Sequence, residues 1–360
     1  MAVRVAVFGA TGVVGQQFLV ALEKHPWFTV TRLAASARSA GKRYVDALRN
    51  PDNGASRWLG EEPLPTLFAD MPVEDAATFD PSGLDLVFSG VEEGDVAREL
   101  EPRLAQHIPV VSTASAFRME PDVPLLIPGI NAAHLPLLEL QRKQRGWRGF
   151  IVPIPNCTTT GMAITLKPIL DAFGLQSVVM VSLQALSGAG RNPGVLALDI
   201  LDNVIPYIPK EEEKVRRETG KILGTLQDGA VTPITVPIGA TCTRVNVRDG
   251  HTEVVYVSTQ RPASAEEARV SMAGFAGDLA DLGLPSAPGA PIVIRDDPFR
   301  PQPRLDRDTD HGMATVVGRV EAHDALPNGL KWVLVSHNTR MGAARGAVLT
   351  AELLAKRGYV

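Results

Sequence analysis

The chain has 360 residues, 45% hydrophobic and 21% charged, which is an ordinary globular composition for one large domain or two smaller ones. A formal net charge of −4 argues against a protein that binds nucleic acid or a membrane surface. Two cysteines exclude a disulfide framework, no apolar run is long enough to span a membrane, and no signal-peptide pattern is present. We therefore expect a cytoplasmic protein without nucleic-acid or membrane partners.

The N-terminal segment predicts a strand, a glycine-rich turn and a helix. Residues 3–8 are continuously apolar, which is typical of a strand buried on both faces. Gly9, Gly12 and Gly15 follow, and a helical apolar pattern then runs as far as Pro26. Such a turn brings a pyrophosphate close to free N–H groups at a helix N-terminus. The spacing is GxxGxxG instead of GxGxxG, so a purely structural turn is the alternative.

The segment after the second predicted strand, residues 28–36, indicates which dinucleotide binds. A NAD site normally places a carboxylate here to bond the ribose hydroxyls, and this segment has none. Two hydroxyls and two cations take its place and suit a 2′-phosphate: Ser36, Arg38, Ser39 and Lys42. We therefore predict NADP, with a solvated basic loop as the alternative.

Two later strand-like runs, residues 84–89 and 108–112, end in small polar residues. In a parallel sheet these ends form the ligand crevice, so we expect Ser89 and residues 112–115 to line it. The region up to residue 153 therefore has the pattern of one doubly wound α/β domain.

A cysteine lies where an extended run meets a helical pattern, in VPIPNCTTTGMAITLKPIL (152–170). Apolar residues recur at helical spacing from here to Phe173, and Gly174 is a typical helix stop. A helix N-terminus lowers the pKa of a nearby thiol and offers N–H groups to an oxyanion. We interpret Cys157 as a nucleophile; the alternative is a small buried residue, which is our interpretation of Cys242.

A cysteine nucleophile needs a base, and one of the seven histidines has a suggestive setting. TRVNVRDGHTEVVYVS contains two strand-like runs joined by a hairpin signal at residues 248–250. Such a hairpin would direct Arg244 and His251 into one pocket. A histidine in a surface turn is the alternative.

Nearly the whole chain resembles the aspartate-β-semialdehyde dehydrogenases, in particular the archaeal and fungal subgroup. The motifs that carry the resemblance are, in chain order, VFGATGVVGQ, AASARSAGK, STASAFRMEPDVPLLIPGIN, PNCTTTG, LQALSGAGRNPGV, NVIPYIPKEEEKVRRETGKILG, TRVNVRDGHT, PQPRLDRDTDHGMATVVGRV and SHNTRMGAARGAVLTAELL. Their combination in this order is far more specific than any one of them. The resemblance implies that NADPH reduces L-aspartyl-4-phosphate to L-aspartate 4-semialdehyde and phosphate, on the way to lysine, methionine and threonine.

The resemblance also implies a role for each site residue. The catalytic residues are Cys157 as nucleophile, His251 as acid/base and Gln184 as the group that orients the thioacyl intermediate, and the Asn156 side chain can hold the oxyanion. The substrate-binding residues are Arg244 for the α-carboxylate, Glu212 for the α-ammonium, and Lys214 and Arg118 for the phosphate. The cofactor-binding residues are Gly9, Thr11, Gly12, Val13, Val14, Ser36, Arg38, Ser39, Lys42, Ser187, Gly188 and Asn338. No metal site is implied.

Three points of this transfer stay open. One sequence does not decide which of Glu211, Glu212 and Glu213 points inward, and without the resemblance the EEEK run predicts only a solvated helix face. His337 stands where an acidic residue is expected before the asparagine. A malonyl-CoA reductase with the same cysteine chemistry and a non-catalytic NADP-binding sensor are the alternative functions; an N-acetyl-glutamyl-phosphate reductase matches GAGRNPG and EEEK poorly.

The expected architecture is an α/β protein, with a doubly wound dinucleotide-binding domain and an α+β catalytic and dimerisation domain. Residues 1–153 together with 338–360 form the first, because the alanine- and glycine-rich last helix suits close packing against it. Residues 154–337 form the second. The resemblance implies a homodimer or homotetramer.

Overall fold

A computed structural model describes residues 2–190, 194–279 and 282–360. Its N-terminal part contains a six-stranded parallel sheet of order β3-β2-β1-β4-β5-β6. The strands are β1 (Val3–Phe8), β2 (Phe28–Ala35), β3 (Val73–Asp75), β4 (Leu86–Ser89), β5 (Val110–Ser112) and β6 (Ile151–Pro153). Because the chain order reverses between β1 and β4, a crevice opens there at the carboxyl ends of the strands, as in other doubly wound sheets.

Strand β1 is buried on both faces, as its continuous apolar run predicts. Val5 and Val7 join the apolar cluster that holds α1 (Val13–Leu22), whereas Ala6 and Phe8 join the cluster that holds α4 (Gly94–Ala105). Successive side chains of a strand point to opposite faces, so this division shows helices covering both sides of the sheet.

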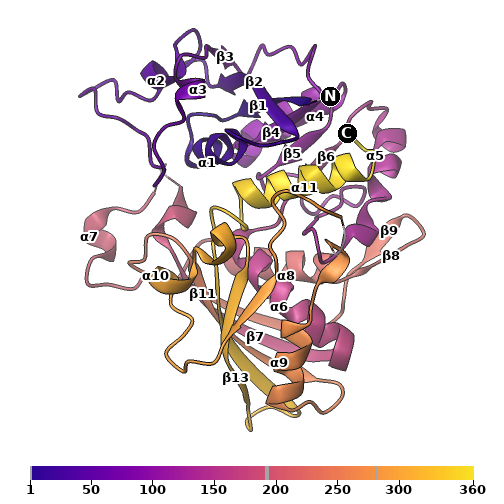
Figure 1. Ribbon diagram of the computed structural model, residues 1–360. Coiled ribbons are helices and arrows are strands. Elements are labelled where there is room, and N and C mark those ends of the chain that lie inside the picture. Colours follow the sequence, from indigo (N-terminus) through magenta and orange to yellow (C-terminus); the bar gives the residue numbers. More distant parts are fainter. Residues whose placement is uncertain (1, 191–193, 280–281) are drawn as a thin grey trace.

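The last helix, α11 (Ala344–Lys356), returns to the N-terminal part and packs against α1. Figure 1 shows it in yellow beneath the first sheet, with both chain termini near the same edge of the molecule. Its buried alanines allow this close approach, and Glu352 accepts a hydrogen bond from the His25 Nε2 at 2.8 Å. The predicted return of the final helix is therefore confirmed.

The C-terminal part contains a mixed sheet of order β10-β7-β11-β14-β13-β12. Its strands are β7 (Leu175–Gln184), β10 (Ile238–Arg244), β11 (His251–Thr259), β12 (Ile292–Arg295), β13 (Thr315–Ala322) and β14 (Gly329–Ser336). Helices α6 (Cys157–Phe173), α8 (Glu211–Ile222) and α9 (Ala265–Ala273) pack against it. A small hairpin of β8 (Thr225–Gln227) and β9 (Ala230–Thr232) stands apart.

The remaining helices are short or lie at the periphery: α2 (Tyr44–Ala47), α3 (Thr66–Ala69), α5 (Leu137–Arg145), α7 (Ala197–Ile200) and α10 (Pro303–Asp306). Within the described ranges, no helix is long and apolar enough to cross a membrane.

The predicted hairpin at residues 248–250 is wrong. Strand β7 lies between β10 and β11, pairing in parallel with the first and antiparallel with the second. The connection therefore passes over the end of β7, and Gly250 adopts φ +92° in that turn. Arg244 is opposite Gln184 in the register, and His251 begins β11 at the same end of the sheet, so the two residues still converge. A turn motif predicts that the chain reverses direction. It does not predict that another strand will pair between the two runs, because that depends on the tertiary fold.

Candidate active site

A cavity of about 590 Å³ lies where the carboxyl ends of the two sheets meet. Its walls come from the turns after β1, β4, β5 and β6 of the first sheet and from the ends of β7, β10 and β14 of the second. Among its lining residues are Val13, Val14, Glu92, Thr113, Ser115, Arg118, Asn156, Cys157, Ser187, Gly188, Glu211, Lys214, Arg244 and Asn338. Most of the catalytic and substrate residues expected from the sequence therefore face one space.

Cys157 lines the cavity, and His251, which is not among the lining residues, contacts its sulfur. The sulfur lies 3.1 Å from the His251 Nε2, and Cys157 is half-buried whereas His251 is fully buried. The two residues are the first of α6 and the first of β11. The other imidazole nitrogen, Nδ1, accepts a hydrogen bond from the Ala185 backbone N–H at 3.0 Å. The Cys157 thiol, the His251 imidazole and the Ala185 N–H that orients the ring therefore form one chain of contacts.

The start of α6 places the cysteine. Asn156 is the N-cap residue, and its Oδ1 accepts from the backbone N–H groups of Thr158 and Thr159 at 2.9 and 3.2 Å. Gly174 ends the helix with φ 71°. The predicted limits of this helix are confirmed.

The expected lowering of the thiol pKa is wrong for this cavity. Burial raises the pKa of the Cys157 thiol to about 12, and the Glu211 carboxylate adds to the effect. Arg244, Arg118 and the Thr158 N–H act in the opposite direction but are outweighed. Burial also lowers the pKa of His251 well below its usual value, with Arg244 and His337 adding to this shift. Both pKa shifts favour the neutral form of the group.

Arg244 and Gln184 stand beside this pair. The buried Arg244 donates from Nη1 to the Ala185 carbonyl at 2.7 Å, so the backbone N–H and C=O of one residue hold the histidine and the arginine respectively. Gln184, at the end of β7, is buried and donates to the Ser182 hydroxyl at 3.2 Å and to Glu211 at 3.3 Å.

Glu211, and not Glu212, faces the cavity. Glu211 is buried and accepts from the Asn156 Nδ2 at 2.7 Å, and its other oxygen lies 3.6 Å from the Lys214 Nζ. Glu212 turns toward the sheet, where it accepts from the Cys242 backbone N–H at 3.2 Å. The placement of Glu212 in the site is therefore corrected, because helix α8 begins at Glu211 and directs only every third or fourth residue to one side. Cys242 itself is buried, as predicted.

A second carboxylate of α8 binds two of the residues that line the cavity. The buried Glu218 accepts from the Arg118 guanidinium at 3.0 Å and from the Asn156 backbone N–H at 2.7 Å. Lys221, one turn further, donates to three backbone carbonyls between residues 118 and 123. The helix predicted as a solvated face thus carries a buried charged side.

The end of the cavity where the sequence predicts the cofactor begins at the glycine turn. Gly12 is the N-cap of α1, and Val13 and Val14 of the first turn line the cavity, with Thr11 half-buried beside them. Gly9 has φ +67°, and a Cβ there would lie 2.6 Å from the Gly90 carbonyl oxygen. The turn therefore requires glycine for its own geometry and also leaves the N-terminus of α1 open to an anion.

The loop after β2 lies outside the cavity lining. Ser36, Arg38 and Lys42 are exposed on it, whereas Ser39 is buried and donates its backbone N–H to the Ser36 carbonyl at 2.8 Å. The loop thus presents two cations and a hydroxyl beside the carboxyl edge of the sheet.

Asn338 connects the segment after β7 to the turn before His251. Its Nδ2 donates to the Ser187 hydroxyl at 2.8 Å, and its Oδ1 accepts from the Gly250 N–H at 2.9 Å, next to His251. Gly188 packs so closely that a Cβ there would lie 3.0 Å from both the His251 ring and the Arg244 guanidinium. Residues 191–193 of the LQALSGAGRNPGV motif lie outside the described residues.

Not every expected strand end faces the crevice. Thr113, Ala114 and Ser115 do line the cavity. The hydroxyls of Ser89 and Ser112 instead donate to the buried Glu101 of α4 at 2.7 and 2.6 Å. Burial raises the pKa of Glu101 to about 7, against the effect of those two hydroxyls. The pattern of small polar residues at a strand end does not predict whether a side chain points into the cavity or toward a covering helix.

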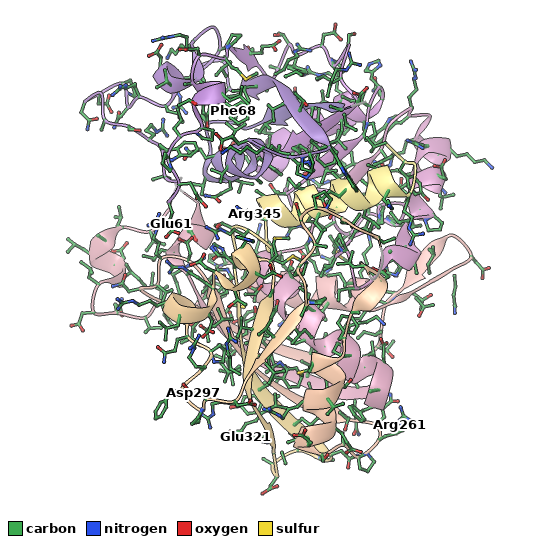
Figure 2. The ribbon with its side chains drawn as sticks, viewed as in Figure 1. Glu61, Phe68, Arg261, Asp297, Glu321 and Arg345 are labelled. Atoms are coloured by element: carbon green, nitrogen blue, oxygen red, sulfur yellow. The ribbon has the colours of Figure 1, made fainter. Side chains whose placement is uncertain are left out.

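Ion pairs join the two parts of the chain beside the cavity. Glu61 lies 3.2 Å from Arg248 and 3.3 Å from Arg307, and Glu62 lies 3.0 Å from Arg340. Figure 2 shows Glu61 at the edge of the N-terminal part that faces the C-terminal part, and Arg345 at the start of α11. Burial lowers the pKa of His337, which stands where an acidic residue was expected, to about 3, and Arg340 and Arg307 add to this shift.

Relatives of known name extend over the whole chain. Residues 4–137 match the semialdehyde dehydrogenase NAD-binding domain family, and residues 166–341 match the semialdehyde dehydrogenase dimerisation domain family. An aspartate-semialdehyde dehydrogenase of Methanothermobacter thermautotrophicus is 47% identical over 98% of this chain and 99% of the relative. The chain belongs to the aspartate-semialdehyde dehydrogenase family. A Candida albicans member is 41% identical over 99% of both chains.

Solved structures of the aspartate-semialdehyde dehydrogenase family share the fold. The crystal structure of the Candida albicans enzyme with NADP superposes with a TM-score of 0.88, at 38% identity over 100% of both chains. A Vibrio cholerae enzyme, described as complexed with ASA, superposes with a TM-score of 0.77 at 27% identity, again over 100% of both chains.

Three site features escaped the sequence reasoning, even with the family resemblance: the inward orientation of Glu211, the support from Glu218 and the Ala185 peptide. For the two acids a signal was present. They are seven residues apart and flank Val215, one of the few apolar residues of α8, which places all three on one side of the helix. Nothing in the sequence marks the Ala185 backbone, because its N–H and C=O make these contacts whatever the side chain.

Proposed function

We propose that this protein catalyses the NADPH-dependent reductive dephosphorylation of L-aspartyl-4-phosphate to L-aspartate 4-semialdehyde, a step toward lysine, methionine and threonine. The observation that carries the proposal is that Cys157, 3.1 Å from His251, lines the same cavity as Arg244, Arg118 and Lys214. A thiol nucleophile among cations suits a substrate that bears a carboxylate and an acyl phosphate. The relatives that carry this name match the chain over nearly its full length.

The thiol gives the reaction its two steps. Cys157 attacks the acyl carbon, phosphate leaves, and an enzyme thioester forms. A thioester accepts hydride more readily than a carboxylate, so one hard reduction becomes two feasible ones. NADPH supplies the hydride. The Cys157 N–H, with the Asn156 amide nearby, is available to the oxyanion.

Each charged wall residue has a counterpart on the substrate. Arg244 is placed to bind the α-carboxylate bidentately. Glu211 takes the role expected of Glu212 and pairs with the α-ammonium. Lys214 and Arg118 bind the phosphate; Glu218 holds the Arg118 guanidinium in place at 3.0 Å.

We infer that NADP lies along the glycine turn, with its pyrophosphate at the N-terminus of α1 and its 2′-phosphate at Ser36, Arg38 and Lys42. Ser187, Gly188 and Asn338 line the cavity near Cys157 and form the nicotinamide end. The domain division proposed from the sequence, 1–153 with 338–360 and 154–337, places each sheet in one unit.

We also infer a cytoplasmic homo-oligomer, a homodimer or homotetramer, built through the open face of the second sheet. Val179 is 44% exposed although β7 is an interior strand, whereas its neighbours Val178 and Met180 are buried under the helices. An apolar face of this kind marks a protein interface. Light scattering of the purified protein, with a Val179→Glu variant, tests this directly.

The decisive assay is reduction of NADP by purified protein, which runs the reaction in reverse. Aspartate semialdehyde with phosphate is compared with malonate semialdehyde plus CoA, and Cys157→Ala is the control. NADPH formation with aspartate semialdehyde only when phosphate is present, lost in the control, supports the proposal. Activity only with the CoA pair would reassign the protein to malonyl-CoA reduction. Inactivity with both pairs would favour a sensor that binds NADP without catalysis.

A further inference from the structure

We infer that residues 57–62, the strap, form a latch between the two parts of the chain, and that Gln16 is a positioning residue which links this latch to NADP binding. The strap belongs to the N-terminal part and reaches arginines of the C-terminal part. It lies apart from the catalytic side chains, so this role is separate from the chemistry at Cys157. It rests on the proposed function only for the position of NADP at the glycine turn.

The Gln16 side chain joins the glycine turn to the strap. It belongs to α1 and is buried, at 1% exposure. Its Nε2 donates to the Thr11 carbonyl at 3.2 Å and to the Arg57 carbonyl at 3.0 Å, and its Oε1 accepts from the Leu59 N–H at 2.7 Å. A buried amide that uses both protons and its oxygen favours a single arrangement of its partners. The position of Thr11, in the turn that offers N–H groups to an anion, therefore depends on the strap.

The far end of the strap carries two carboxylates to the C-terminal part. Glu61 lies 3.2 Å from Arg248 and 3.3 Å from Arg307, and Figure 2 shows it at the edge between the two parts. Glu62 lies 3.0 Å from Arg340. Partly exposed ion pairs contribute little each, so three of them hold the strap in place and still allow it to open.

The arginines of the latch belong to segments that reach the catalytic end. Arg248 comes three residues before His251, and Arg340 comes two residues after Asn338. The Asn338 Oδ1 accepts from the Gly250 N–H at 2.9 Å, so these two segments are tied to each other. A movement of the strap therefore reaches the glycine turn on one side and the proposed nicotinamide end on the other.

A second cavity, of about 720 Å³, borders the strap. Residues from both sides of the latch line it, among them Trp58, Glu61, Glu62, Arg248 and Arg340. It shares Val13, Ser187 and Thr339 with the catalytic cavity, so the two spaces adjoin. The strap thus borders open space, which leaves room for the movement that a latch needs.

Closure of the latch should favour NADP. In the closed form, the glycine turn that receives the pyrophosphate is held beside Ser187 and Asn338 at the nicotinamide end. In the open form these two regions separate, and the dinucleotide loses contacts at one of its ends. A ligand that prefers the closed form raises its population, and weakening the latch must lower the affinity for that ligand in turn.

Trp58 reports the state of the strap. Its Nε1 donates to the Glu62 carbonyl at 2.7 Å, and a Cβ on Gly60 would lie 2.9 Å from its ring, so the indole packs within the strap. Its emission is obtained by difference from a Trp58→Phe variant. We expect nucleotide-free Glu61→Gln/Glu62→Gln protein to emit at longer wavelength than the wild type, because a loosened strap exposes the ring. Saturating NADP should reverse the shift. Equal emission of the two proteins, or a shift that NADP leaves unchanged, would overturn the inference.

Calorimetry of NADP binding, without substrate, is the second test. Glu61→Gln/Glu62→Gln should raise the Kd about tenfold, whereas the matched Glu74→Gln, which breaks an ion pair with Arg32 inside the N-terminal part, should leave it unchanged. Gln16→Leu should also raise the Kd, and adding it to the strap variant should have little further effect, because both break the same link. Equal Kd values for the strap variant and Glu74→Gln, or fully multiplicative effects, would contradict the latch.

The strap variant decides the question by itself if Gln16→Leu does not fold, since Glu61 and Glu62 are partly exposed. Neither readout requires aspartate semialdehyde or turnover. The latch can therefore fail while the proposed activity stands, and the activity can fail while the latch stands.

Discussion

The two ends of the cavity are built in different ways. The proposed nucleotide site uses the backbone of the glycine turn at the cavity and the exposed side chains of the loop after β2, which lies outside the cavity lining; both segments fall within residues 9–42. The catalytic end gathers groups from α6, β7, α8, β10 and β11, and many of these groups bond one another. The Asn156 side chain and Gln184 donate to Glu211, the Asn156 backbone N–H donates to Glu218, and Cys157 contacts His251.

The difference follows from what each end must bind. A phosphate is held by N–H groups and solvated cations, which a short local segment can supply. Thiol chemistry and substrate charges need desolvated groups, and every such group needs a partner from elsewhere in the chain. We therefore expect substitutions at the catalytic end to have large, coupled effects and those at the nucleotide end to have small, local ones.

The largest effect belongs to the nucleophile. Cys157→Ala should lower kcat/KM by on the order of 10³-fold or more, because no other group can form the thioester. Binding of NADP, followed by calorimetry, should be unchanged. Cys242→Ala is the matched control, since this buried thiol lies off the cavity lining. If Cys157→Ala retained activity, Cys157 would not be the nucleophile, and the expected contrast between the catalytic and nucleotide ends would fail.

The support beneath the nucleophile comes next. Glu218→Gln leaves the buried Arg118 without its carboxylate, so the free energy of unfolding should fall by roughly 3–5 kcal/mol, measured in urea. Catalysis should fall as well, because Asn156 loses a charged acceptor. Glu213→Gln on the exposed side of α8 is the control. Equal behaviour of the two variants would show that α8 only fills space.

A buried carboxyl group of the N-terminal part should make the free energy of unfolding depend on pH. Glu101 has its pKa raised from about 4.5 to about 7, so its contribution to stability is complete below pH 4.5 and is lost as the pH rises through 7. Denaturation between these pH values should show a loss of about 3 kcal/mol that Glu101→Gln removes. An identical pH profile in the variant would contradict the raised pKa.

The smallest effect is expected in the loop after β2. Arg38→Ala should weaken NADP binding about tenfold, or about 1.4 kcal/mol, and leave NAD binding unchanged, because only NADP carries the 2′-phosphate. Arg43→Ala is the control, since this exposed guanidinium already pairs with Asp46 and Asp70. An equal loss for both dinucleotides in Arg38→Ala would exclude the loop as the 2′-phosphate site.

The same contrast decides what the sequence could predict. The strand, turn and helix of residues 3–22, the start of α6 at Cys157 and the return of α11 depend on local patterns, and all are confirmed. The hairpin at residues 248–250 failed because β7 inserts between its two strands. The thiol pKa and the choice of Glu211 over Glu212 failed because both depend on burial and on partners distant in the sequence.

The most direct test of the account is to trap the acyl-enzyme. Protein incubated with aspartate semialdehyde and NADP without phosphate is quenched in acid, digested and analysed by mass spectrometry. The account predicts an aspartyl thioester on the Cys157 peptide that disappears when phosphate is added before the quench. An unmodified Cys157 peptide under conditions that form NADPH, or an adduct on another residue, would contradict it.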